Sequence, residues 1–232
     1  MRRASSASCS GIASLLLLVT QSSALSFNRK ILLLPGSCSS AGAFLNMASG
    51  SAPLIGAAKA TYHDGGRLAW LFEAVDPQTS SGEWFCPGGQ GEGAEESIAA
   101  VEAALDAGGF AGLVGFDDGA ALASLVAARA ALGEGCTGLQ FAVMCSSTLP
   151  KPNEALLHRL RDSPDARLLP TLHCLSKAGT AGQSAQGEAL AACFPSAELM
   201  WHEGGHAMPP RDRLKSVVQF FERSWSGGKG RW

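Results

Sequence analysis

The sequence predicts a single α/β domain, built on a mostly parallel sheet with helices on both faces. Continuous apolar runs, such as residues 31–34 and 111–116, are typical of strands buried on both faces. Segments with helical spacing lie between these runs, and such alternation along a chain means a parallel sheet. The length of 232 residues, 46% of them apolar, suits the core of one such domain.

Each element is placed by its apolar pattern and by the residues that end it. The first strand closes at Pro35-Gly36, and the first helix repeats apolar residues up to Leu105 before Gly108-Gly109. Residues 76–94, rich in Pro, Gly and Ser, predict a long loop that is a candidate lid. Strands are predicted at 31–34, 68–75, 111–116, 139–145, 168–175 and 197–201. Helices are predicted at 95–107, 120–132, 153–161 (capped by Asn153), 186–193 and 212–223.

The first 26 residues have the pattern of a secretory signal peptide. Arg2 and Arg3 precede an apolar run at 12–19, and small residues follow it. The run is far shorter than the ~20 residues that span a bilayer, so no membrane span is expected in the mature chain. Phe27 after the predicted cut resembles algal plastid leaders, but a strand starting near Lys30 leaves no room for a transit peptide. We therefore predict the secretory pathway, with one domain at 27–232.

Composition excludes several classes of function. The chain has 18 Lys and Arg against 20 Asp and Glu, a net charge of −2. Because it has no basic patch of the size that binds nucleic acid, such a role is disfavoured. No phosphate loop, dinucleotide fingerprint or zinc spacing is present, so neither a cofactor nor a metal is expected. Of seven cysteines, six follow the signal peptide. They contain no CxxC pair, and we interpret most of them as buried small apolar residues, with room for one disulfide of undefined pairing.

The turn at 115–119, G-F-D-D-G, has the context of a nucleophile elbow because it ends a buried strand and opens an Ala-rich helix. Such a turn needs both glycines, since flanking side chains would collide. It exposes the central residue, here Asp117, and aims the next backbone N–H, of Asp118, at a developing oxyanion. A second oxyanion donor would come from Ser37, which follows the first strand. His206 follows the last strand and is the candidate base.

In this order the motifs resemble those of the FSH-type serine hydrolases, the ovarian-cancer-associated-2-like group. The resemblance covers residues 30–222. It is carried by L-P-G-S at 34–37, E-E-S-I at 95–98, G-F-D-D-G-A at 115–120, F-A-V at 141–143, L-H at 172–173 and G-G-H-A-M-P at 204–209. The resemblance implies an α/β-hydrolase fold and esterase ancestry, with a small apolar ester-like substrate or ligand.

The departures from the family pattern fall on the catalytic triad. Asp117 stands where the resemblance implies the serine nucleophile, and Gly179 where it implies the acid. Pro35 replaces a loop histidine. Glu188 and Glu203 are the nearest candidate acids, but the first falls in a predicted helix and the second lies very close to His206 along the chain. Only His206 of the implied triad remains.

Three interpretations of Asp117 follow. It could be a nucleophile, as in epoxide hydrolases and haloalkane dehalogenases, because a carboxylate needs no base for activation. It could instead pair with His206 in a non-catalytic relative that binds a small ligand. In the third interpretation a cysteine acts, Cys38 or Cys145. The loss of two triad positions favours the second interpretation slightly over the first and well over the third.

Overall fold

The computed structural model of the chain describes residues 30–36, 41–49, 62–63, 66–67, 71–74 and 93–225. The predicted signal peptide, nearly all of the predicted loop at 76–94, and Ser37 and Cys38 lie outside these ranges. The predictions made for them stay predictions.

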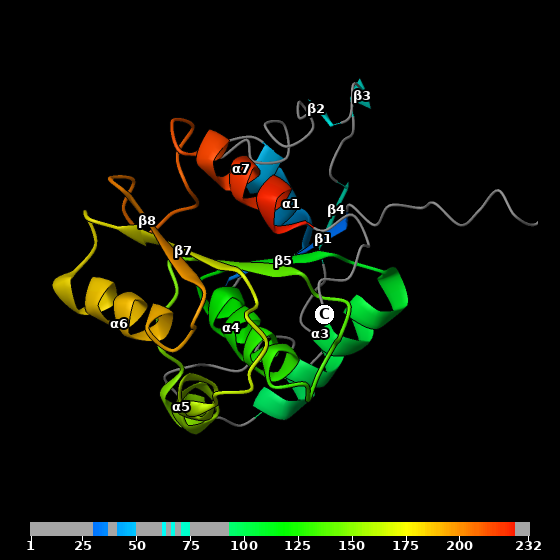
Figure 1. Ribbon diagram of the computed structural model, residues 1–232. Helices are drawn as coiled ribbons and strands as arrows, with labels where there is room; N and C mark the ends of the chain where they lie inside the picture. The colour runs from blue at the N-terminus through cyan, green and yellow to red at the C-terminus, as the bar shows by residue number, and fades with distance from the viewer. Residues whose placement is uncertain are drawn as a thin grey trace, which may run out of the picture.

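Six parallel strands form one sheet in the order β4-β1-β5-β6-β7-β8 (Figure 1). They are β1 (Lys30–Leu34), β4 (Leu71–Ala74), β5 (Gly112–Phe116), β6 (Phe141–Cys145), β7 (Thr171–Ser176) and β8 (Ala197–His202). A small antiparallel pair, β2 (Tyr62–His63) and β3 (Gly66–Arg67), is separate. The strand order reverses at β1, and open α/β sheets bind ligands beyond the strand ends at such a point. A ligand site is therefore expected at the loops after β1 and β5.

Helices cover both faces of the sheet, as the sequence predicted (Figure 1). One face carries α1 (Ala41–Ser49) and α7 (Leu214–Ser224). The other carries α3 (Ala94–Gly108), α4 (Asp118–Ala131), α5 (Glu154–Asp162), which follows a short 3₁₀ turn at Lys151–Asn153, and α6 (Ala181–Ala191). The buried side chains form two clusters, and neighbouring residues of β1 enter different clusters: Leu32 packs in one and Leu33 in the other. This alternation follows from the pleat of a strand buried on both faces.

Helix α4 is buried along almost its whole length under the middle of the sheet. Its alanines let the helix backbone approach the strands closely, and its first residue, Asp118, directly follows the end of β5 and Asp117. The elbow is therefore fixed to the best-packed helix of the domain.

Three local details differ from the sequence predictions. Helix α6 begins at Ala181 rather than residue 186, because Thr180 and Gln183 form a capping box at its start. Asn153 precedes α5 but makes no capping hydrogen bond. Helix α1 was not predicted at all. Gly109, by contrast, ends α3 with a left-handed backbone of φ 62°, as its position predicted.

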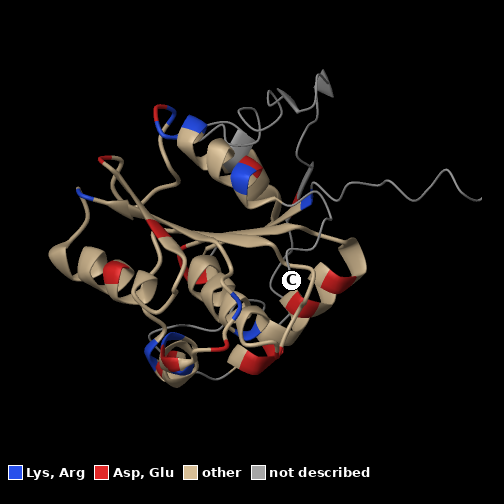
Figure 2. Ribbon diagram, viewed as in Figure 1, with Lys and Arg blue, Asp and Glu red and all other residues tan. Residues whose placement is uncertain are grey.

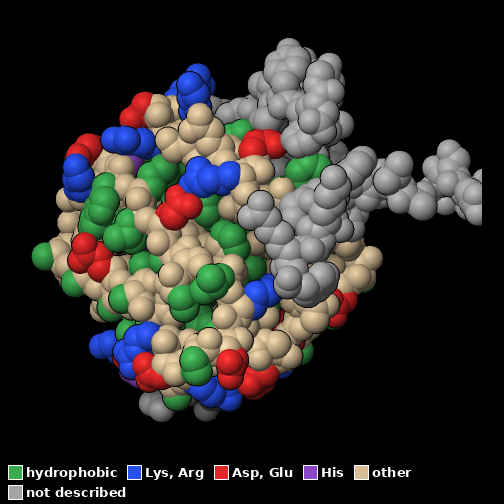
Figure 3. All heavy atoms as spheres, viewed as in Figure 1, with side chains coloured by type: hydrophobic (Ala, Val, Ile, Leu, Met, Phe, Trp, Pro, Cys, Tyr) green, Lys and Arg blue, Asp and Glu red, His purple; other side chains and the backbone are tan. Residues whose placement is uncertain are grey.

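Charged residues of both signs alternate along the ribbon in Figure 2, and their side chains are interspersed on the face shown in Figure 3. Within the described ranges, no helix is both long and apolar enough to cross a membrane. The same ranges hold no cluster of three or more His, Cys, Asp and Glu suited to a metal ion.

A buried histidine on β7 makes the stability of the fold depend on pH. His173 is 1% exposed, packs against Phe194 and lies 3.3 Å from the Thr171 hydroxyl through one ring nitrogen. Burial lowers the pKa of His173 to about 3. The unfolded chain, with a histidine pKa near 6.5, therefore binds more protons between pH 6.5 and pH 3, so stability falls as the pH is lowered through that window.

Between pH 7 and pH 4.5, we expect the unfolding free energy of the wild-type protein to fall by about 2.7 kcal/mol more than that of His173→Gln. This difference corresponds to the two pH units between the unfolded histidine pKa, near 6.5, and pH 4.5. Urea unfolding at both pH values measures this difference. Other titrating groups, including His202, are present in both proteins and cancel. Equal losses in wild type and His173→Gln would contradict the prediction.

Candidate active site

Asp117 occupies the turn between β5 and α4 with a backbone that non-glycine residues rarely adopt, φ 55° and ψ −121°. Its N–H donates to the Cys145 carbonyl at 3.0 Å, and its carbonyl accepts from the N–H groups of Ala120 and Ala121. Such a conformation costs on the order of 1–3 kcal/mol and persists only where the surroundings impose it. The elbow that the motif predicted is therefore present, with an aspartate side chain at its tip.

The two elbow glycines are required by close contacts between backbones. A Cβ atom on Gly115 would lie 2.3 Å from the Gly119 carbonyl oxygen, and one on Gly119 would lie 2.3 Å from the Pro35 carbonyl oxygen. Gly36, just after β1, also lies against the elbow, since a Cβ on Gly36 would be 2.8 Å from that of Asp117. The structure thus brings the end of β1 to Asp117. The oxyanion role predicted for Ser37 and for the Asp118 N–H remains a prediction.

His206, from the loop between β8 and α7, lies beside Asp117. Its Nε2 is 3.4 Å from Asp117 Oδ1, and its ring lies 5.2 Å from the ring of Phe116, centroid to centroid. The side chains of His206 and Asp117 are 45% and 31% exposed. An ion pair this accessible to water contributes about 0–1 kcal/mol, so it cannot by itself hold the loop in place. The two residues that the sequence singled out are therefore brought together.

Two hydrogen bonds fix the loop that carries His206. The Ser146 hydroxyl, directly after β6, donates to the Ala207 carbonyl at 3.1 Å. The Gly204 N–H donates to Nδ1 of His202 at 3.1 Å, which requires an unprotonated Nδ1. Burial, reinforced by the charge of Arg213, lowers the pKa of His202. Ser146 was not predicted from the sequence, because its partner Ala207 is far away along the chain and no local motif marks the contact.

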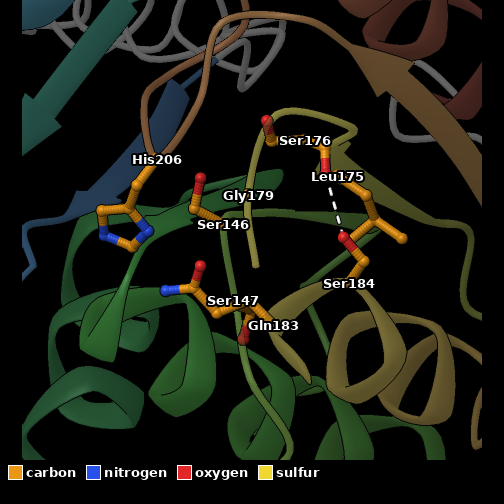
Figure 4. A pocket seen from close by; sticks show the side chains of 8 residues that line it. All are labelled: Ser146, Ser147, Leu175, Ser176, Gly179, Gln183, Ser184 and His206. Atoms are coloured by element: carbon orange, nitrogen blue, oxygen red, sulfur yellow. Dashed lines mark hydrogen bonds between the residues drawn. The ribbon is translucent and has the colours of Figure 1, made fainter. Parts of the chain in front are cut away.

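A small pocket opens beside His206 (Figure 4). It encloses about 20 Å³, enough for roughly one water molecule. The residues lining it are Ser146, Ser147, Leu175, Ser176, Gly179, Gln183, Ser184 and His206. Gly179, at the position implied for the acid, therefore shares a pocket with the histidine, and none of the lining residues is acidic.

The amide of Gln183 occupies the space next to Gly179. A Cβ atom on Gly179 would lie 3.4 Å from Gln183 Oε1, which accepts the Thr180 N–H at 3.2 Å. The two acids considered from the sequence point elsewhere. Glu203 pairs with Lys177 at 3.4 Å, and Glu188 is exposed on α6. The carboxylate that contacts His206 is that of Asp117.

The structure gives no support to Cys145 as a nucleophile. It ends β6 at the expected edge of the sheet, but it is 1% exposed and lies within an apolar cluster. Its neighbour in the sheet register is Cys174, whose pKa is raised well above the usual value by burial and by a hydrogen bond with Cys145. All the cysteines in the described ranges, Cys136, Cys145, Cys174 and Cys193, are free and buried, as predicted for most of them.

Comparison with known proteins identifies the family of this chain. The family model described as "Serine hydrolase (FSH1)" matches residues 20–218. The chain belongs to this family. Similar proteins include human Esterase OVCA2, 36% identical over 140 residues (56% of this chain, 59% of the relative), and Esterase CG5412 of Drosophila melanogaster, 33% identical over 137 residues (58% and 48%). The chain thus spans about half the length of the curated relatives it matches.

Solved structures agree with the fold expected of this serine hydrolase family. The acyl-protein thioesterase 2 of Zea mays superposes with a TM-score of 0.60 at 20% identity, over 85% of this chain and 94% of its own. Esterase PE8 gives 0.59 at 17% identity, over 84% and 92%. The predicted α/β-hydrolase fold is therefore confirmed.

Proposed function

We propose that this member of the FSH1 family binds a small apolar ester-like ligand and has weak or absent serine-esterase activity. The observation that carries the proposal is the 3.4 Å contact between His206 Nε2 and Asp117 Oδ1 at the tip of the elbow. In a serine esterase the histidine takes a proton from the nucleophile's hydroxyl. Here the atom facing the histidine is a carboxyl oxygen of Asp117 and not a serine hydroxyl.

The missing acid supports the same proposal. In a serine protease, breaking the link between acid and histidine costs about 10⁴ in kcat, even with the nucleophile present. In this chain both the nucleophile and the implied acid are replaced, and the pocket beside His206 has no acidic lining residue. The elbow and its contact with Gly36 after β1 are nevertheless present, which supports a ligand site at the tip of the elbow.

A second candidate function is hydrolysis with Asp117 as the nucleophile. Asp117 is favoured for this role by its strained elbow backbone, its partial exposure and its adjacent histidine. One Asp117 oxygen would attack the carbon of an epoxide or an alkyl halide and form an ester, while the opened epoxide oxygen takes a proton from water or halide is released. A water deprotonated by His206 would then cleave that ester and restore the carboxylate. Ester substrates would follow the same two steps through an anhydride.

Turnover of short-chain nitrophenyl esters and of small epoxides tests the two candidates. We expect wild type to hydrolyse esters far below the 1–10³ s⁻¹ typical of enzymes, and to bind a non-hydrolysable ester analogue saturably in calorimetry. Asp117→Asn, which keeps the shape and removes the charge, is the matched variant. Wild-type turnover that Asp117→Asn abolishes would establish the nucleophile and overturn the binding proposal. Absence of both turnover and saturable binding would contradict both candidates.

A further inference from the structure

Ser146 and Asp117 both have a positive φ and lie at the ends of neighbouring strands. Among the residues that the structure describes, they are the two non-glycine residues with positive φ, at 54° and 55°. Phe116 and Cys145, which precede them, are register partners on β5 and β6. Backbone strain of this kind clusters at functional sites, because the surroundings must impose it. The strain at Asp117 belongs to the elbow, whereas the strain at Ser146 has no such explanation.

The strained backbone of Ser146 directs its hydroxyl to the loop of the histidine. Its N–H keeps a sheet-like bond to the Cys174 carbonyl at 3.1 Å, while its Oγ donates to the Ala207 carbonyl at 3.1 Å. Ala207 directly follows His206. In Figure 4 the side chains of Ser146 and His206 are neighbours at the same end of the pocket. The hydroxyl thus ties the end of β6 to the backbone that carries the imidazole.

We propose that Ser146 is a positioning residue, which holds His206 against Asp117 through the Ala207 carbonyl. The Asp117–His206 pair is too accessible to water to anchor the loop, although the His206 ring also contacts Phe116 and the Ala207 N–H donates to the Gly205 carbonyl within the loop. The partly buried hydrogen bond from Ser146 to Ala207 ties this part of the loop to the end of β6. This inference rests on the proposed function only because both concern the same site. His206 must lie against Asp117 whether the two residues bind a ligand or catalyse a reaction.

The test is the position of the His206 ring in solution. The ring protons of His206 and Phe116 should give a nuclear Overhauser effect in wild type, with the His206 signals assigned by comparison with His206→Gln. We expect Ser146→Ala to abolish this effect and to shift the His206 signals. Ser124→Ala is the matched control, because Ser124 is a buried serine of α4 whose hydroxyl also donates to a carbonyl, that of Ala121.

Ser146→Gly is a second variant for the case in which Ser146→Ala does not fold, since glycine adopts positive φ without strain. It should lose the Overhauser effect as Ser146→Ala does, yet melt at a higher temperature than Ser146→Ala. Retention of the effect and of the His206 signals in either folded variant would overturn the inference. So would an equal loss in Ser124→Ala. None of these readouts requires turnover, so the outcome is independent of the Asp117→Asn experiment.

Discussion

Replacing Gly119 by alanine is expected to destabilise the protein by about 3 kcal/mol, or to prevent it from folding. The added Cβ would lie 2.3 Å from the Pro35 carbonyl oxygen and 2.4 Å from that of Leu34. Both atoms belong to the backbone at the end of β1, so no side-chain rotation can relieve the contact. Because β1 is a central strand of the sheet, moving it would disturb both layers of the core. Urea unfolding, followed by circular dichroism, measures the loss.

Gly182→Ala is the matched control for this substitution. Gly182 lies in α6, and a Cβ atom there would meet no heavy atom within 4 Å. Alanine should therefore stabilise the helix by up to about 1 kcal/mol, through its higher helix propensity. The two glycine substitutions thus have opposite expected signs. A Gly119→Ala protein as stable as wild type would show that the β1 loop does not approach the elbow as the structure has it.

These contacts explain why the elbow was predictable from the sequence. A strand, a sharp turn and a helix can be joined in this way only if residues 115 and 119 are glycine. This steric requirement therefore produces a short sequence motif that can be recognised without the structure. The pairing of Asp117 with His206 was predictable for a related reason. Parallel strands deliver their following loops to one edge of the sheet, so residues distant along the chain meet there.

Other features depend on contacts that no local pattern encodes. The hydroxyl of Ser146 finds its partner in the loop after β8, and a serine at the end of a strand has no distinctive signature. Helix α1 was missed because its sequence, A-G-A-F-L-N-M-A-S, has no charged residue to mark a polar face or an end. The start of α6 was misplaced because the capping box precedes the residues that give the helix its apolar pattern.

Placing a serine at position 117 and an acid at position 179, where the resemblance implies the nucleophile and the acid, is expected to produce serine-esterase activity. Asp117→Ser alone should give only slow ester cleavage, because His206 would lack an acid to orient it. Adding Gly179→Asp should raise kcat/KM by up to about 10⁴, the factor that an acid contributes in a serine protease. The structure has room for the change: the nearest atom to a Cβ on Gly179 is Gln183 Oε1 at 3.4 Å. The new carboxylate would also lie at the N-terminus of α6, which stabilises negative charge.

Asp117→Ser combined with Gly182→Asp is the control that separates geometry from charge. Gly182 follows Gly179 by three positions and is exposed on α6, so this variant has the same net charge without an acid in the pocket. Activity in the Gly179 variant alone would mean that the pocket still holds the arrangement in which an acid, His206 and an elbow serine act together. Equal activities in the two double variants would mean that Gly179 does not face His206 productively. The shape of the whole β7–α6 loop, and not residue 179 alone, would then keep an acid from orienting His206.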